Sequence, residues 1–403
     1  MTAKERFLKY VTFHTTSDEN SSSCPSTEGQ RTLLSFLKEE LLAMGIAAEQ
    51  DENGYVTARI PANAEGLPVL CFLAHVDTSP AVSGENVRPR EVVYEGGDIP
   101  LGNGVTLSEK DNPDLRELIG ETLIVTDGNT LLGADDKAGV AEIVTAAERM
   151  VNDPSFRHGE IAIAFTPDEE IGRGTDLFDV EKFAADFGYT VDGGKLGEIE
   201  YENFNAAAAT IEVKGYSIHP GGAKNRMKNA VDLFCEFHDL LPEADRPVHT
   251  ENYEGFYMAD ELSADVEKAT CKYIIRDHDR ENFRRRKEFF LSCADFLNGK
   301  YGEGTFTATV KDSYYNMASV IRENFHLVEN ARKAMKDCGI EPITVPIRGG
   351  TDGARLSFLG LPCPNLSTGG YNFHSRTEFI PAGAPDRMTE VILKIVSLYA
   401  ERQ

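Results

Sequence analysis

Residues 69–78 read VLCFLAHVDT, a short apolar run that ends abruptly in polar residues. This pattern is typical of a buried parallel strand, and functional side chains of α/β proteins gather where such strands end. The pattern returns at 160–170 (EIAIAFTPDEE) and at 189–194 (YTVDGG). Between the first two, residues 138–150 carry apolar side chains at helical spacing. Strands that alternate with helices predict an α/β fold with a mostly parallel sheet flanked by helices.

The pattern of the sequence changes after about residue 205, where helices and alternating strands no longer follow the α/β order. The expected strands and helices of this region are 206–214, 225–241, 271–276, 280–297 and 305–311. Their β-α-β-α-β order indicates a smaller α+β domain inserted into the chain. We therefore expect one α/β domain built from 1–205 and 313–403, and an inserted domain at 206–312.

Composition excludes several classes of function. The 403 residues include 41 Lys and Arg against 66 Asp and Glu, a formal net charge of −25. This charge, without any basic run, argues against nucleic acid and against a membrane surface as partners. The apolar runs are far shorter than the ~20 residues of a membrane-spanning helix, and the N-terminus lacks the apolar core of a signal peptide. Seven cysteines without a C-x-x-C pair indicate reduced thiols and a cytoplasmic location.

Polar residues that can bind a metal ion follow several of the apolar segments. They are His75, Asp77, Asp135, Asp136, Glu169, Glu170, Asp192 and His374. In a parallel sheet these residues meet at one edge, where so many carboxylates are costly without a cation. Mixed histidine and carboxylate ligands suit zinc, manganese or cobalt better than calcium or magnesium. Taken singly, each has an ordinary alternative, such as a helix cap for the Asp-Asp pair or a turn for Asp192-Gly-Gly.

Several longer motifs resemble the peptidase T family. They are STEGQ (26–30), HVDTSP (75–80), LLGADDKAGVAEI (131–143), AFTPDEEIG (164–172), YTVDGG (189–194), YIIRDHDR (273–280), PIRGGTDGA (346–354) and LPCPNLSTGGYNFH (361–374). This family is the aminotripeptidase branch of the two-zinc exopeptidases, which are related to aminoacylases and bacterial carboxypeptidases. The motifs stand in the family's order and span most of the chain.

The resemblance implies two zinc ions, with manganese or cobalt as possible substitutes. It implies Asp135 as the bridging ligand, with His75 and Asp192 completing one site. Glu170 and His374 complete the other. Asp136 is a competing candidate for the bridge, and Asp135 is favoured because the family's ligand stands two residues before the lysine. The resemblance also implies a cis peptide bond between Asp135 and Asp136.

The resemblance further implies the roles of residues that act on the substrate. Glu169 corresponds to the general base and Asp77 to the carboxylate that orients His75. In the inserted domain, His219 corresponds to a residue that stabilises the oxyanion, in relatives often from a partner subunit. Arg276 and Arg348 correspond to residues that bind the substrate carboxylate. The ordinary alternatives are a surface histidine before a proline and an arginine paired with Asp277.

We therefore expect a cytoplasmic metallo-aminopeptidase that releases the N-terminal residue from tripeptides. Its catalytic domain would be 1–205 and 313–403, and 206–312 would be a lid that also mediates a possible homodimer. Alternatives of the same two-metal type are a dipeptidase, a carboxypeptidase or a deacylase of N-acyl amino acids. A non-catalytic peptide or metal binder is a further alternative, against which the presence of Glu169 beside all five ligands argues.

Overall fold

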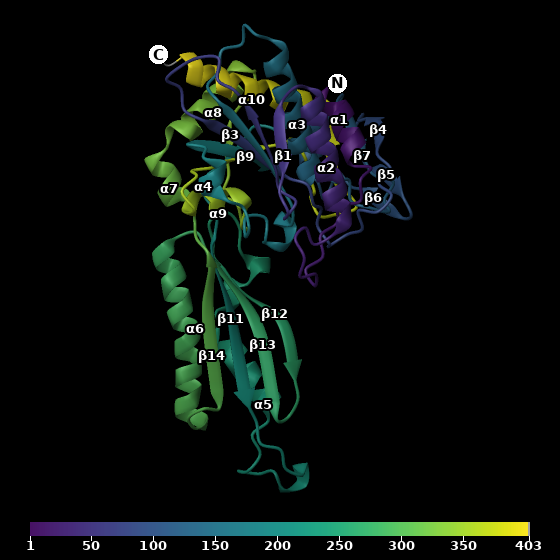
Figure 1. Cartoon of the computed structure of the whole chain (residues 1–403). Helices are drawn as coiled ribbons and strands as arrows, with labels where there is room; N and C mark the ends of the chain where they lie inside the picture. The colour runs from purple at the N-terminus through teal and green to yellow at the C-terminus, as the bar shows by residue number, and fades with distance from the viewer. Residues whose placement is uncertain (402–403) are drawn as a thin grey trace. The chain divides into compact units, whose positions relative to one another are not determined.

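The computed structural model describes residues 1–401, which form two compact units (Figure 1). Unit 1 comprises Met1–Tyr201, Ser319–Val345 and the chain from Thr351 onward. Unit 2 comprises Glu202–Ala318 and Pro346–Gly350. The predicted inserted domain, 206–312, lies within the first segment of unit 2. The prediction kept 346–350 with the larger domain, whereas this short segment clusters with unit 2.

The centre of unit 1 is an eight-stranded sheet in the order β1-β2-β8-β3-β9-β16-β10-β15. The strands are β1 (Ala47–Gln50), β2 (Val56–Ile60), β3 (Leu70–His75), β8 (Ile161–Thr166), β9 (Phe187–Gly193), β10 (Glu198–Glu200), β15 (Ile343–Thr344) and β16 (Asn365–Ser367). Neighbours among the central strands β8, β3, β9 and β16 pair in parallel. Antiparallel pairing joins β2 to β8 and β1 to β2. The predicted α/β fold class, with a mostly parallel central sheet, is confirmed.

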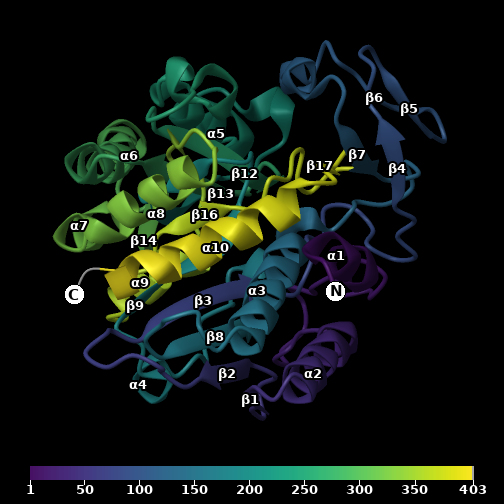
Figure 2. The same ribbon diagram turned by 90° about the horizontal axis from the view of Figure 1, so that it is seen from above.

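Helices cover this sheet. They are α1 (Ala3–Tyr10), α2 (Glu28–Ala43), α3 (Ala134–Asn152), α4 (Val180–Phe183), α7 (Ala318–Glu323), α8 (His326–Asp337), α9 (Asp352–Phe358) and α10 (Ala384–Glu401). Helices α3 and α10 lie side by side across the parallel strands (Figure 2). Every residue of β3 and β8 is buried, which explains why both strands are continuous apolar runs. Within residues 1–401, each helix is too short or too polar to cross a membrane.

Two small antiparallel sheets extend unit 1, and the sequence analysis does not anticipate them. Their strands are β4 (Arg90–Val93), β5 (Ile99–Gly102), β6 (Val105–Leu107), β7 (Thr122–Val125) and β17 (Phe379–Pro381). Strand β7 is central in the order β17-β7-β4, and β5 pairs with β6. Because Phe379 pairs with Val125, the segment after His374 lies beside the segment that leads to Asp135.

Unit 2 is built on a four-stranded antiparallel sheet in the order β12-β13-β11-β14. Its elements are β11 (Asn205–Lys214), α5 (Ala230–Leu240), β12 (Phe256–Ala264), β13 (Lys268–Asp277), α6 (Arg280–Tyr301) and β14 (Phe306–Tyr314). Figure 1 shows α6 running along this sheet, and its Phe290 packs with Ile211 and Phe237 in one core. Strand β12 is not predicted from the sequence, because most of its residues are exposed and its apolar residues do not alternate with polar ones.

The parallel strands of unit 1 place their carboxyl ends along one edge. His75, the last residue of β3, is in register with Thr166, the last residue of β8. Asp192 lies near the end of β9, which pairs in parallel with both β3 and β16. The polar residues that follow each strand therefore converge at this edge.

Candidate metal centre

One group of candidate metal ligands lies at the ends of β3 and β9. Nε2 of His75 is 3.0 Å from Oδ1 of Asp135 and 3.2 Å from Oδ1 of Asp192. The His75 side chain is only 2% exposed. One ligand atom from each of these three residues lies within 4.8 Å of the others, so the group can hold a metal ion.

A second group shares Asp135 with the first. Nε2 of His374 is 3.0 Å from Oδ2 of Asp135 and 2.9 Å from Oε2 of Glu170. The carboxylate of Asp135 thus directs one oxygen toward each histidine. A carboxylate arranged in this way can bridge two metal ions. The His374 side chain is 47% exposed whereas that of Glu170 is 4% exposed, so this second group is open to solvent on the side of His374.

The donor set fits a pair of divalent cations. A tetrahedral zinc ion with ligands at about 2.0–2.1 Å sets its ligand atoms about 3.3 Å apart, close to the separations found here. The buried Oε1 of Glu170 has no hydrogen-bond partner among residues 1–401, and so remains available for a cation. Three carboxylates and two imidazoles match the mixed oxygen and nitrogen ligation that transition metals prefer.

Electrostatics at this edge also favour a cation. Burial raises the pKa of Glu170 to about 8 and that of Asp192 to about 6, with the charge of Asp135 adding to both. Hydrogen bonds with Asp135 and Glu170 raise the pKa of His374 to about 11. Without a metal ion, bound protons therefore offset the negative charge of the neighbouring carboxylates. A divalent cation supplies the same compensation and displaces those protons.

Asp77 connects a candidate ligand to the turn that carries Glu169. Its Oδ1 lies 3.3 Å from Nδ1 of His75, which directs Nε2 of the ring toward the other ligands. The same carboxylate accepts the backbone N–H of Glu169 at 3.0 Å and that of Glu170 at 3.1 Å. The Asp77 side chain is fully buried.

Glu169 begins the short 3₁₀ turn η2 (Glu169–Ile171), next to the candidate ligand Glu170. Its carboxylate makes no hydrogen bond or ion pair within residues 1–401. Burial raises its pKa well above the usual range, and the nearby charge of Asp192 acts in the same direction. A half-buried carboxylate without a hydrogen-bond or ion-pair partner, beside candidate metal ligands, is suited to accept a proton.

Glu378, which is not among the residues predicted from the sequence, supports the loop that leads to Asp135. Its buried carboxylate accepts the backbone N–H groups of Leu132 at 2.7 Å, Gly133 at 2.9 Å and Asp135 at 3.2 Å. The Asp135–Asp136 peptide bond is cis, which confirms the prediction for that bond. The only sequence signal for Glu378 is its place four residues after His374, because its partners are backbone groups that no motif records.

Hydrogen bonds from neighbouring strands also hold the backbone of Asp192 in place. Its backbone N–H donates to Oδ1 of Asn365 at 3.1 Å, and Nδ2 of Asn365 donates to Oε2 of Glu200 at 2.6 Å. Burial raises the pKa of Glu200 to about 8. Asn365 and Glu200 come from β16 and β10, so the sheet itself fixes this chain of contacts.

The other three predicted site residues belong to unit 2. His219 is exposed, and its Nδ1 accepts the backbone N–H of Gly221 at 3.1 Å. Arg276 is half-buried over the ring of Tyr314, and only Nη1 of its guanidinium donates to backbone oxygens. The carboxylate of Asp277 instead pairs with Arg286, so the Arg276–Asp277 ion pair considered above does not form.

Arg348 is held more completely than Arg276. Its Nη1 donates to the backbone oxygens of Asn252 at 2.8 Å and Glu254 at 3.0 Å. Its Nη2 donates to Oγ1 of Thr250 at 2.9 Å. The guanidinium lies over the ring of Phe204. Both terminal nitrogens therefore fasten the segment 346–350 to the rest of unit 2.

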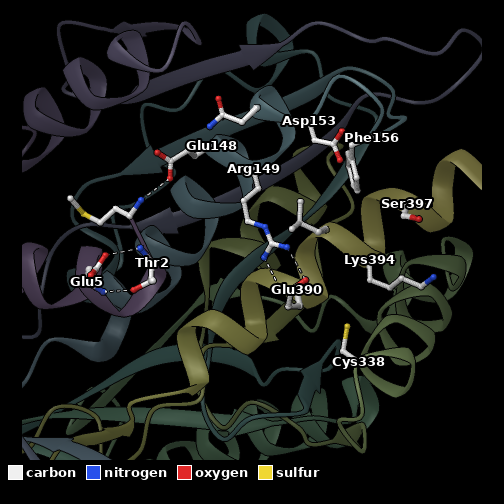
Figure 3. A pocket seen from close by; sticks show the side chains of 13 residues that line it. Thr2, Glu5, Glu148, Arg149, Asp153, Phe156, Cys338, Glu390, Lys394 and Ser397 are labelled. Atoms are coloured by element: carbon white, nitrogen blue, oxygen red, sulfur yellow. Dashed lines mark hydrogen bonds and ion pairs between the residues drawn. The ribbon is translucent and has the colours of Figure 1, made fainter.

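A large surface pocket of about 890 Å³ lies at the opposite end of α3 from Asp135 (Figure 3). Two ion pairs lie in its lining, Arg149 with Glu390 and the N-terminal amine with Glu148. Glu148 and Asp135 are separated by 13 residues of α3, about 20 Å at the rise of an α-helix. This pocket is therefore separate from the candidate metal centre.

Comparison with other sequences identifies full-length relatives. Peptidase T of Caldanaerobacter subterraneus subsp. tengcongensis is 55% identical over 99% of this chain and 98% of its own. Peptidase T of Clostridium perfringens is 54% identical over 99% of both chains. The model of peptidase family M20/M25/M40 matches residues 125–398, which include Asp135, Glu170, Asp192 and His374.

Solved structures share the fold. Aminopeptidase PepT from Bacillus cereus superposes with a TM-score of 0.78 at 22% identity, covering 99% of both chains. A tripeptidase from Staphylococcus aureus gives 0.79 at 21% identity over the whole of both chains. YXEP from Bacillus subtilis, described as a dinuclear metal binding peptidase from the M20 family, gives 0.67 at 14% identity over 100% of this chain and 99% of its own. The chain therefore belongs to peptidase family M20/M25/M40, with relatives named peptidase T along its full length, and the resemblance found in its motifs is confirmed.

Proposed function

We propose that this protein is a metal-dependent aminopeptidase that releases the N-terminal residue from tripeptides. The observation that carries the proposal is the shared carboxylate of Asp135, whose two oxygens face His75 and His374 at 3.0 Å each. The names of the full-length relatives, peptidase T, and of the solved aminopeptidase and tripeptidase support the same activity.

Five residues would hold two metal ions, most simply zinc, with manganese or cobalt as substitutes. Asp135 would bridge them, with His75 and Asp192 on one side and Glu170 and His374 on the other. Such a pair of ions polarises the scissile carbonyl and lowers the pKa of a bound water. Asp77 would keep the His75 ring oriented for binding through its contact with Nδ1.

Glu169 would act as the general base. Its unpaired carboxylate would take the proton of the attacking water and then deliver it to the nitrogen of the leaving dipeptide. The same residue would thus serve as base and then as acid. Because Glu170, a candidate metal ligand, is the next residue in the chain, Glu169 would lie close to the water bound at the metal centre.

Unit 2 would supply the groups that bind the substrate. His219 would stabilise the developing oxyanion, and Arg276 and Arg348 would bind the carboxylate at the C-terminus of the peptide. Arg276 is the better candidate for direct contact, because Nε and Nη2 of its guanidinium are not used in the hydrogen bonds described above. Recognition of both peptide ends would restrict cleavage to tripeptides.

We also propose a cytoplasmic location and a homodimer formed through unit 2. All seven cysteines are free, in keeping with a reducing compartment. On unit 2, Leu262 of β12 and both Phe289 and Phe296 of α6 are exposed. Sedimentation equilibrium tests the homodimer, and a monomer at micromolar concentration would contradict it.

Product analysis tests the proposed activity. The zinc-loaded protein is incubated with a tripeptide, its N-acetyl form and the corresponding dipeptide, with and without chelator, and the products are identified by mass. Release of the N-terminal residue from the free tripeptide alone, abolished by chelator, is the expected result. Cleavage of the acetylated peptide would indicate a deacylase or carboxypeptidase, and cleavage of the dipeptide a dipeptidase.

A further inference from the structure

We propose that Asp168, Ser26 and Gln30 form a clamp that positions the general base Glu169. We call these three residues the Asp168 clamp. The inference rests on the role of Glu169 proposed above. It assigns a task to the STEGQ motif, which that role leaves unused.

The clamp is a dense set of hydrogen bonds on one buried carboxylate. Asp168 accepts the backbone N–H of Ser26 at 2.8 Å and the Ser26 hydroxyl. It also accepts Nε2 of Gln30 at 2.8 Å, and its own backbone N–H donates to Oε1 of Gln30 at 3.0 Å. Gln30 therefore forms hydrogen bonds with both the side chain and the backbone of Asp168. The three side chains are buried.

The clamp acts at the point where the backbone turns toward the metal centre. Asp168 adopts a left-handed conformation with φ of 60°, which residues other than glycine rarely occupy. The next residue, Glu169, starts the 3₁₀ turn. The hydrogen bonds from Ser26 and Gln30 hold Asp168 in this conformation. They thereby set the direction of the backbone at Glu169, after the end of strand β8.

Asp77 holds the same turn from its other side, through the N–H groups of Glu169 and Glu170. The Glu169 backbone is thus fixed both before and after its Cα. This matters because the Glu169 carboxylate has no partner of its own within residues 1–401. A general base must lie within hydrogen-bond reach of the proton it takes, so small displacements of its backbone slow the reaction.

The two clamp residues that bind Asp168, Ser26 and Gln30, come from a distant part of the chain, just before and within the first turn of α2. An added Cβ at Gly29 would collide with the backbone oxygen of His14, so glycine lets this first helical turn pack closely. Ser26 and Gln30 reach Asp168 across 142 and 138 positions of sequence. The order of the STEGQ motif thus follows from the geometry: a serine before the helix, a glycine at the close contact and a glutamine on the first turn.

A double-mutant cycle tests the clamp. We expect Gln30→Ala to lower kcat about tenfold or more at unchanged KM and with full zinc content. In a Glu169→Gln background the same change should alter kcat less than twofold, because no base remains to be positioned. A merely structural role would reduce kcat by the same factor in both backgrounds, which would overturn the proposal.

Two further variants keep the test decisive. Gln50→Ala removes a glutamine of unit 1 that also makes two hydrogen bonds, with Ser35 and Gly54, and should leave kcat unchanged. Ser26→Ala removes one hydroxyl and serves if Gln30→Ala does not fold; it should lower kcat in the same background-dependent way. A normal kcat in a folded clamp variant, or a loss fully explained by lost zinc, contradicts the clamp. Full turnover by Glu169→Gln alone would instead refute the proposed base, and the clamp with it.

Discussion

His75 and His374 direct Nε2 at the same carboxylate from equal distances of 3.0 Å, yet one ring is 2% exposed and the other 47%. The two candidate metal sites therefore share a ligand but differ in their access to solvent. A chelator reaches an exposed site more readily than a buried one, so the two metals should not leave together.

We expect metal loss in two phases. Brief dialysis against a chelator should remove about one equivalent of metal quickly and the second slowly, because His75 and Asp192 lie in a buried environment. His374→Ala should retain a single slowly released equivalent, measured by elemental analysis. Release of both equivalents at one rate from the unmodified protein, or two full equivalents in His374→Ala, would contradict this assignment.

Glu169→Ala should bind both metals and lose at least about a hundredfold in kcat, in line with general-base catalysis. The carboxylate makes no hydrogen bond or ion pair within residues 1–401 that its removal would break, so the fold should be retained. Glu19→Ala, at an exposed position, is the matched control and should keep full activity. Normal turnover by Glu169→Ala at full metal content would remove this residue from the mechanism.

Glu378→Gln should weaken metal binding without replacing any candidate ligand. Oε2 of Glu378 accepts the N–H groups of Leu132 and Gly133, and Oε1 accepts that of Asp135. The substitution replaces one of these two acceptor oxygens by a donor, so at least one N–H group loses its acceptor. We expect metal affinity to fall about 10–100-fold, as for other residues that orient ligands. Competition with a fluorescent chelator measures this. Glu390→Gln, which alters only an exposed ion pair with Arg149, should bind metal normally.

Substitutions of Arg276 and Arg348 should have different effects, the first on substrate binding and the second on stability. Arg276→Lys should raise KM for a tripeptide much more than for its C-terminal amide, because only the former presents a carboxylate. Arg348→Lys should lower the thermal stability of unit 2, since both terminal guanidinium nitrogens are bonded to the 250–254 segment. Equal effects of Arg276→Lys on both substrates would exclude it as the carboxylate ligand.

Glu142 should make stability depend on pH. Both carboxylate oxygens are buried without a partner in residues 1–401, and burial raises the pKa of this group well above its usual 4.5. The folded protein therefore holds a proton that the unfolded chain releases above pH 4.5. Stability from this group is present below pH 4.5 and is lost as pH rises toward the folded-state pKa, by about 1.4 kcal/mol per pH unit.

Glu142→Met tests this dependence because methionine is apolar and of similar size. The free energy of unfolding in urea should be less sensitive to pH in the variant, so that the variant gains stability relative to the parent between pH 5 and pH 8. A difference between the two proteins that stays constant over this range would show that Glu142 is ionised in the folded state.

The sequence predicted the candidate centre well where side chains follow apolar strands. His75, Asp192 and Glu170 each come shortly after a run that is readable from sequence, and parallel pairing then brings them together. Asp135 and His374 were candidates from the sequence as well, but choosing Asp135 over Asp136 as the bridging ligand required the resemblance, since a helix cap gives the same sequence signal. The strand β12 escaped prediction because an exposed edge strand needs no apolar alternation.

Residues that act through the backbone could not be predicted. Glu378 accepts backbone N–H groups, which every residue type except proline offers, so its partners are not recognisable in the sequence. The segment 346–350 joins unit 2 through Arg348 and the carbonyl oxygens of a loop, another set of contacts without side-chain identity. Long-range polar contacts of this kind emerge only when the chain is folded.

The contacts of Asp77 have an evolutionary consequence. One carboxylate contacts the ring of a candidate ligand and also the backbone of Glu169, the proposed general base. Selection for metal affinity and selection for proton transfer therefore both act on the Asp77 carboxylate. A mutation of this residue would affect both properties together. A lineage that abandoned catalysis but kept its metals would still have to retain this aspartate, so its presence alone is a poor guide to whether a relative is an active enzyme.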